Sequence, residues 1–197
     1  SGLVDRVDVS HYRLAIHLIV AFFILSLILW NYLTLKNFNF TKSKIDFYFP
    51  TIFLFLIYCQ ISIGAFVSGM DAGTIYNSWP LMGSSYFPDD NSFSNLFNIN
   101  AFNEPSIVQF IHRNLAYIIF LFYIIILYNV YKKKLKDLYN STIVVGLLLI
   151  FQILLGIFTL LYGAQIILAS MHQISSIFLV SSCVYFLYIN TKSNQQP

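Results

Sequence analysis

The chain has 197 residues, of which 58% are hydrophobic and only 10% are charged, and its mean hydropathy is +0.72. Ordinary soluble domains carry about 25% charged residues, so this composition excludes that class and indicates a membrane protein. The formal net charge of +3 is small and comes mostly from lysines in two loops, so it gives no reason to expect a nucleic-acid partner.

Five apolar runs are long enough to cross about 30 Å of hydrocarbon, which takes about 20 helical residues. None of them shows the alternation of polar and apolar residues, in segments of about ten, that a membrane barrel needs. The sequence therefore predicts an all-α integral membrane protein with five transmembrane helices. In chain order the runs are Leu14–Leu35, Phe47–Gly69, Ile107–Tyr131, Thr142–Ala164 and Ile166–Ile189.

The loops predict how the five spans are oriented, because short cytoplasmic loops collect lysine and arginine. The connection 70–106 carries four carboxylates and no Lys or Arg, so we expect it outside, together with the N-terminus. The links after the first and third spans are rich in lysine, so we expect both in the cytoplasm. Their lysines are Lys36, Lys42, Lys44, Lys132, Lys133, Lys134 and Lys136.

The first span reads as the end of an earlier unit and not as part of the four spans that follow. The stretch "LAIH" at 14–17 resembles "LASMH" at 168–172, and each lies near the start of a helix that runs from outside to inside. We therefore expect an external stretch and the last helix of a truncated first unit in residues 1–35. A four-helix unit follows in 47–190, and 191–197 form a cytoplasmic tail.

Three of the four histidines lie inside the predicted spans at similar depths. At about 1.5 Å of rise per residue, His17 lies roughly 4–5 Å below the outer end of its helix, His112 about 7–8 Å and His172 about 9 Å. Ionisable residues inside spans usually face the bundle interior, so each is a functional candidate. A hydrogen bond to a neighbouring helix explains one such histidine more readily than three at one depth. His11, close to Arg13 at the water interface, is expected to have no special role.

Two neutral imidazoles from separate helices suit the two axial positions of a haem iron, with the flat macrocycle held between the helices. Zinc needs a third or fourth ligand, and no carboxylate or thiol lies in this layer of the sequence. A proton relay would place Asp or Glu inside the spans, which contain none. Haem is therefore the favoured ligand, and Gly64 and Gly156 would let a macrocycle or a neighbouring helix approach closely. The two cysteines, Cys59 and Cys183, are expected to stay free within the spans.

Four stretches of the chain are unusual enough to be compared with known families. They are "VSHYRLAIHL" at 9–18, "GAFVSGMDAGTIYNSWPLMG" at 64–83, "NEPSIVQFIHRNLAY" at 103–117 and "LLGIFTLLYGAQIILASMHQ" at 154–173. Together they resemble the heme A synthase family, in the subgroup without external cysteine pairs, and they occur in the family's order over nearly the whole chain. The family implies an eight-helix membrane enzyme made of two similar four-helix halves. This chain resembles its fourth helix and the complete second half.

The resemblance implies roles for three histidines. His112 and His172 match the histidines that ligate a haem b in the second half, and His17 matches one of the two that receive haem O in the first half. The family's reaction oxidises a ring methyl of haem O to a formyl group, which yields haem A for cytochrome oxidase, while the bis-histidine haem carries electrons. No catalytic residue is assigned in this chain, and we expect the chain alone to be inactive. Gln109, three residues before His112, cannot act as the carboxylate base that the first half supplies.

Two further features of the outer side carry expectations. Arg113 is a candidate cofactor-binding residue that would pair with a haem propionate, and the alternative is an arginine whose side chain simply extends to water. The segment 75–102 is too aromatic for a disordered linker, so we expect it to fold as a lid over the outer haem edge or to lie at the membrane interface.

The resemblance also implies partners and a location. Haem O is the expected substrate, heme O synthase and oxidase assembly factors are expected partners, and the sequence does not identify the electron acceptor. The expected location is a bacterial cytoplasmic membrane, in preference to a mitochondrial inner membrane. Two functions from other classes stay open: a membrane cytochrome b subunit that only transfers electrons, and a haem-free transporter or assembly factor whose histidines pack helices.

Overall fold

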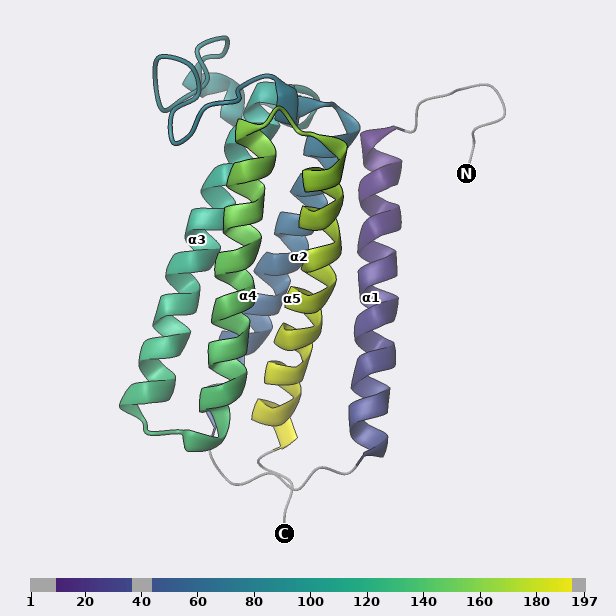
Figure 1. Cartoon of the computed structure of the whole chain (residues 1–197), viewed down its shortest axis with the longest axis vertical. Coiled ribbons are helices and arrows are strands. Elements are labelled where there is room, and N and C mark those ends of the chain that lie inside the picture. Colours follow the sequence, from purple (N-terminus) through teal and green to yellow (C-terminus); the bar gives the residue numbers. More distant parts are fainter. Residues whose placement is uncertain (1–9, 37–43, 193–197) are drawn as a thin grey trace, which may run out of the picture.

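A computed structural model describes residues 10–36 and 44–192 of the chain. Five long helices run side by side (Figure 1), and each is long and apolar enough to cross a membrane. The prediction of an all-α protein with five membrane helices is therefore confirmed. The helices are α1 (His11–Leu35), α2 (Tyr48–Gly69), α3 (Pro105–Lys132), α4 (Lys136–Leu161) and α5 (Ile166–Lys192).

Helices α1, α3 and α4 begin two to six residues before the apolar runs that predicted them. Helix α3 begins at Pro105, a residue that suits a first helical position because it has no N–H to leave unpaired. Helix α4 begins at Lys136, six residues before the expected Thr142. Hydropathy marks the part of a helix that can lie in hydrocarbon, whereas the helix itself continues into the polar region beyond.

Helices α2 to α5 form a four-helix bundle. Each packs against the next in chain order, and α5 closes the ring by packing against α2. Helices α3 and α5 therefore lie diagonally across the bundle from each other. Helix α1 lies outside the ring, where it packs against α2 and α5 (Figure 1).

The two ends of the bundle carry different connections. At one end, here called the loop end, residues 70–104 connect α2 to α3 and include three short 3₁₀ turns: Ala72–Thr74, Phe93–Phe97 and Ala101–Asn103. The short α4–α5 turn at Gly163 and Ala164 lies at the same end (Figure 1). The opposite end, here called the lysine end, carries the tight α3–α4 turn with Lys132, Lys133, Lys134 and Lys136.

The lysine half of the bundle holds most of the closely packed core. Phe53, Ile126 and Val180 come from three different helices and are at most 1% exposed. Two polar side chains add connections there: the Tyr188 hydroxyl donates to the Leu33 carbonyl over 2.9 Å, and the Asn190 amide bonds both backbone groups of Ile45. In lipid, helix association depends on such close packing and hydrogen bonds, because hydrophobicity alone does not favour it.

The loop half is packed less completely. All of residues 59–64 of α2 and 110–117 of α3 are half-buried, whichever way around the helix they point. A helix with one closely covered face shows fully buried positions at helical spacing. Among the described residues, these two stretches have none, so neighbouring side chains cover their inner faces only in part.

Candidate functional site

The two histidines predicted to act together lie at the same level of the loop half. His112 is seven residues after the start of α3 and His172 is six residues after the start of α5, which places them about 10 Å and 9 Å along their helices. Because α3 and α5 are diagonal in the bundle, the two side chains come from opposite sides of its interior.

Each of these imidazoles rests against a glycine of the preceding helix. A Cβ atom added to Gly64 of α2 would lie 3.1 Å from Cε1 of His112, and one added to Gly156 of α4 would lie 3.0 Å from Cε1 of His172. Such contacts are tighter than side chains normally make, so any larger residue would displace the ring. The sequence predicted that a macrocycle or a neighbouring helix approaches these glycines, and the group that lies against each of them is an imidazole of a neighbouring helix.

A glutamine one helical turn before each glycine contacts the same histidine. Nε2 of Gln60 lies 3.3 Å from Nε2 of His112 and donates to the His112 carbonyl over 3.1 Å. Nε2 of Gln152 lies 3.3 Å from Nδ1 of His172 and donates to the His172 carbonyl over 2.8 Å. The hydroxyl of Ser175 donates to Oε1 of Gln152 and fixes that amide further.

The two arrangements repeat one pattern. The sequence is "QISIG" at 60–64 of α2 and "QILLG" at 152–156 of α4, and each stretch faces the histidine of the helix that follows it. We call each set of glutamine, glycine and histidine a cradle. Reading the chain for single motifs missed the glutamines as histidine partners, although the repeated Q-x-x-x-G spacing was present in the sequence.

Two imidazoles are a donor set that would suit a haem iron, and one of their four ring nitrogens lies free of a glutamine amide. Nδ1 of His112 and Oε1 of Gln60 are buried and have no hydrogen-bond partner. The described residues contain no cluster of three or more His, Cys, Asp or Glu that could hold a metal ion. Two imidazoles at one level, each with a glycine against its ring, match the donor types of a bis-histidine haem site.

Arg113 points to the connection 70–104 and not to open water. Its guanidinium donates to the carbonyls of Ser78 (2.9 Å), Tyr76 (2.9 Å) and Leu81 (3.3 Å). Its Nε is buried and has no hydrogen-bond partner. The side chain therefore holds a loop in place, a role that neither sequence interpretation of Arg113 included.

Other side chains on α3 hold the same loop. Gln109 donates to the Tyr76 carbonyl over 3.1 Å, and Trp79 donates to the Tyr117 hydroxyl over 2.9 Å. The Tyr86 hydroxyl donates to Asn114 over 2.6 Å. The segment 75–102 is therefore folded, as its aromatic content indicated, and it is attached to the helix that carries His112.

The other two histidines lie apart from the cradles. His17 is exposed on α1, two positions and therefore about 200° around the helix from Ala15, which is buried against the bundle. His11 packs between the rings of Tyr12 and Phe66, with centroid distances of 4.3 Å and 5.4 Å. His17 thus faces outward from this bundle, whereas His11 lies among aromatic rings at the loop end of α1. Cys59 and Cys183 are both free thiols, as predicted.

Comparison with known proteins decides the family. Residues 1–184 match the family model described as cytochrome oxidase assembly protein (COX15-CtaA). The chain belongs to this family. No solved structure matches the chain.

Curated relatives of this chain are named heme A synthase. The one from Pelagibacter ubique is 47% identical over 194 residues, which is 98% of this chain and 56% of the relative. The one from Rickettsia felis is 38% identical over 196 residues, 96% of this chain and 57% of the relative. The chain therefore spans little more than half the length of these relatives.

Proposed function

We propose that this chain supplies the electron-carrying half of a heme A synthase, an oxidoreductase that converts a ring methyl of haem O to a formyl group. The observation that carries the proposal is the pair of matched cradles, which brings His112 and His172 from diagonal helices to one level. The names of the relatives, together with family membership, support the reaction.

In this proposal His112 and His172 would hold a haem b through their imidazole nitrogens. When bound, that haem supplies a one-electron carrier whose potential the protein can tune. Gly64 and Gly156 leave room for the imidazoles, and the amides of Gln60 and Gln152 hold the rings in one orientation. Ligand orientation matters because a ring that rotates freely binds the iron less tightly.

Arg113 has two functions in the proposal. Its terminal nitrogens hold the loop at residues 76–81 over the end of α3, which limits access of water to the cradle of His112. Its positive charge and its unpaired Nε remain for a carboxylate group such as a haem propionate.

We assign His17 to a second haem site, which receives haem O. Its side chain is exposed on the outer face of α1, so it is available to segments that the longer relatives contain and this chain does not. We therefore expect this chain alone to bind haem b but not to convert haem O.

The proposed location is the bacterial cytoplasmic membrane, with the lysine end in the cytoplasm and the loop end outside. The lysines of the α3–α4 turn and the acidic composition of residues 70–104 support this orientation. A Lys134→Cys variant should react with a membrane-impermeant thiol reagent only after cells are opened. Labelling of that cysteine in intact cells would reverse the orientation. Haem O, heme O synthase and oxidase assembly factors are the proposed partners.

The same cradles would also serve a membrane cytochrome b subunit that transfers electrons without acting on haem O. A chimera separates the two functions: the chain is joined to the preceding half of the Pelagibacter relative and expressed with a supply of haem O. Pigment extracted from these membranes should contain haem A, and a His172→Ala chimera should yield little or none. A chimera that binds a low-spin b-type haem but makes no haem A would support the electron-transfer subunit instead.

A further inference from the structure

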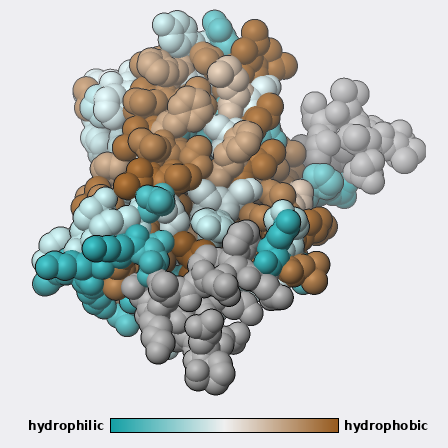
Figure 2. Space-filling view, turned by 60° about the horizontal axis from the view of Figure 1, so that its bottom comes forward, coloured by the Kyte–Doolittle hydropathy of each residue, from teal (hydrophilic) through white to brown (hydrophobic). Residues whose placement is uncertain are grey.

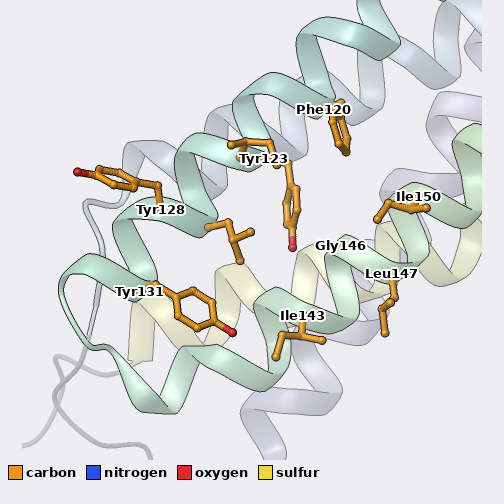
Figure 3. A pocket seen from close by; sticks show the side chains of 10 residues that line it. Phe120, Tyr123, Tyr128, Tyr131, Ile143, Gly146, Leu147 and Ile150 are labelled. Carbon is orange, nitrogen blue, oxygen red and sulfur yellow. The ribbon is translucent and has the colours of Figure 1, made fainter.

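A groove between α3 and α4 lies outside the candidate haem site, in the lysine half of the bundle. Its volume is about 600 Å³, and it is lined by apolar side chains and tyrosine rings (Figure 3). From α3 come Phe120, Tyr123, Ile124, Leu127, Tyr128 and Tyr131, and from α4 come Ile143, Gly146, Leu147 and Ile150.

The floor of the groove is formed by a specific contact. Tyr123 is buried, points toward Gly146 and donates its hydroxyl to the Thr142 carbonyl over 3.0 Å (Figure 3). A Cβ atom at Gly146 would lie 2.0 Å from the Tyr123 hydroxyl, so only glycine allows this contact. The ring thus lies across the helix interface and leaves the outer part of the space between α3 and α4 open.

The length of the groove corresponds to one leaflet of a bilayer. Its lining on α3 runs from Phe120 to Tyr131, which is about 16 Å at 1.5 Å per residue. Half of the hydrocarbon thickness is about 15 Å. One acyl chain of the leaflet at the lysine end therefore matches the groove from its mouth to its inner end.

The mouth of the groove is positively charged. The five residues 132–136 at the α3–α4 turn include four lysines: Lys132, Lys133, Lys134 and Lys136. The Lys132 ammonium lies 5.2 Å from the centroid of the Tyr128 ring in the groove wall. Figure 2 shows hydrophilic residues gathered at this end, beside the hydrophobic flanks of the helices. Basic groups where a gap between membrane helices opens at the interface favour the phosphate of an anionic lipid.

We propose that this groove is a binding site for an anionic phospholipid, with one acyl chain between α3 and α4 and the phosphate at the lysines of the turn. A second copy of the chain fits less well, because a symmetric contact at this groove would bring two clusters of lysines together. The proposal does not depend on haem and concerns a different end of the bundle.

Native mass spectrometry of the purified chain, titrated with phosphatidylglycerol or phosphatidylcholine, tests the site. One molecule of phosphatidylglycerol should bind to the chain at a lower lipid concentration than one molecule of phosphatidylcholine does. The triple variant Lys132→Ala, Lys134→Ala, Lys136→Ala should bind phosphatidylglycerol about ten-fold more weakly or worse. The matched control replaces the three lysines of the other lysine-bearing link, Lys36, Lys42 and Lys44, by alanine and should bind as the wild type does.

A second pair of variants tests the groove itself. Leu147 is 64% exposed in the groove wall, so Leu147→Trp should fill the groove, keep the fold and weaken phosphatidylglycerol binding with all lysines present. Leu27→Trp, at a position 47% exposed on α1, is the control for the added ring. The proposed site would be wrong if both lysine triple variants lost phosphatidylglycerol affinity equally, or if Leu147→Trp bound the lipid as the wild type does. Either result would mean that the lipid binds to surface charge in general and not to the groove. A wild-type dimer that Leu147→Trp dissociates, with lipid binding unaltered, would overturn it in favour of a second copy.

Discussion

The loop half and the lysine half of the bundle are made from the same four helices but are packed differently. In the lysine half, large apolar side chains such as Phe53 and Ile126 are almost completely buried, and two polar side chains of α5 bond backbone groups near the end of α1 and the start of α2. In the loop half, α2 and α3 are half-buried all around, and glutamine, histidine and glycine face the interior. The difference teaches that close packing of one half can hold the helices together while the other half keeps polar side chains in its interior.

The largest effect should come from the ligands themselves. His112→Ala or His172→Ala should abolish the low-spin b-type absorption of the chain, because each variant removes one of the two imidazoles of the site. His17→Ala should leave that spectrum intact, since this side chain faces outward from α1. Reduced-minus-oxidised spectra of the purified proteins, with circular dichroism as a check of helix content, measure both. An unchanged spectrum in His112→Ala would mean that another residue ligates the iron.

A substitution in the lysine half should act on the fold and spare the site. Phe53 is 1% exposed and its ring lies near those of Phe122 and Tyr123, so Phe53→Ala should cost about 3–5 kcal/mol of unfolding free energy. Unfolding in mixed detergent micelles measures this loss. The molecules that remain folded should keep the wild-type haem spectrum. A changed spectrum at unchanged stability would show that the two halves are not separate in function.

Loss of the loop attachment should have the next largest effect. Arg113→Gln removes the donors to the carbonyls of Ser78 and Tyr76, and hydrogen bonds from a charged group contribute about 1.5–3 kcal/mol each. The connection 70–104 should then be cleaved faster in limited proteolysis, and dithionite should reduce the haem faster. Arg13→Gln, at an exposed position of α1 at the same end, is the control. If Arg113→Gln and Arg13→Gln show equal rates of proteolysis and of haem reduction, the loop attachment does not affect access to the site.

The glycines of the cradles provide a finer test. Gly64→Ala and Gly156→Ala each add a methyl group about 3 Å from an imidazole carbon. The methyl group should displace the ring and lower the free energy of unfolding by about 1–3 kcal/mol. Haem affinity, measured by competition with apomyoglobin, should fall while the helix content stays constant. Ser68→Ala, at an exposed position of α2, should change neither quantity. If both alanine variants keep the haem affinity of the wild type, the two glycines serve only the packing of the helices.

The effect expected for the glutamines is no larger than that of the glycines. Gln60→Leu and Gln152→Leu keep both ligands but remove the amides that hold them, and such partners typically change metal affinity about 10-fold to 100-fold. The reduction potential of the haem should also shift, which a purely structural role would not cause. Gln173→Leu, exposed on α5, is the matched control. Potentiometric titration that finds one potential for all four proteins would contradict this role.

The sequence by itself determined the features that depend on local pattern. Hydrocarbon thickness sets the length of an apolar helix, so five spans could be predicted from hydropathy alone, with differences of one to six residues at the helix ends. The depth of His112 and His172 followed from the same counting, and the motifs around them indicated the family that the comparison then established.

Only the tertiary structure decided which side chains meet. The packing of the helices against one another places α3 and α5 on a diagonal of the bundle. It also brings Gln60 and Gln152 into contact with the histidines. In the same way it brings Arg113 to carbonyls that lie 32 to 37 residues away in the sequence. Rotation of a helix about its axis changes these contacts without changing its length or hydropathy. The direction of His17 is the clearest case, since its depth could be counted from the sequence but its outward face depends on where α1 packs against α2 and α5.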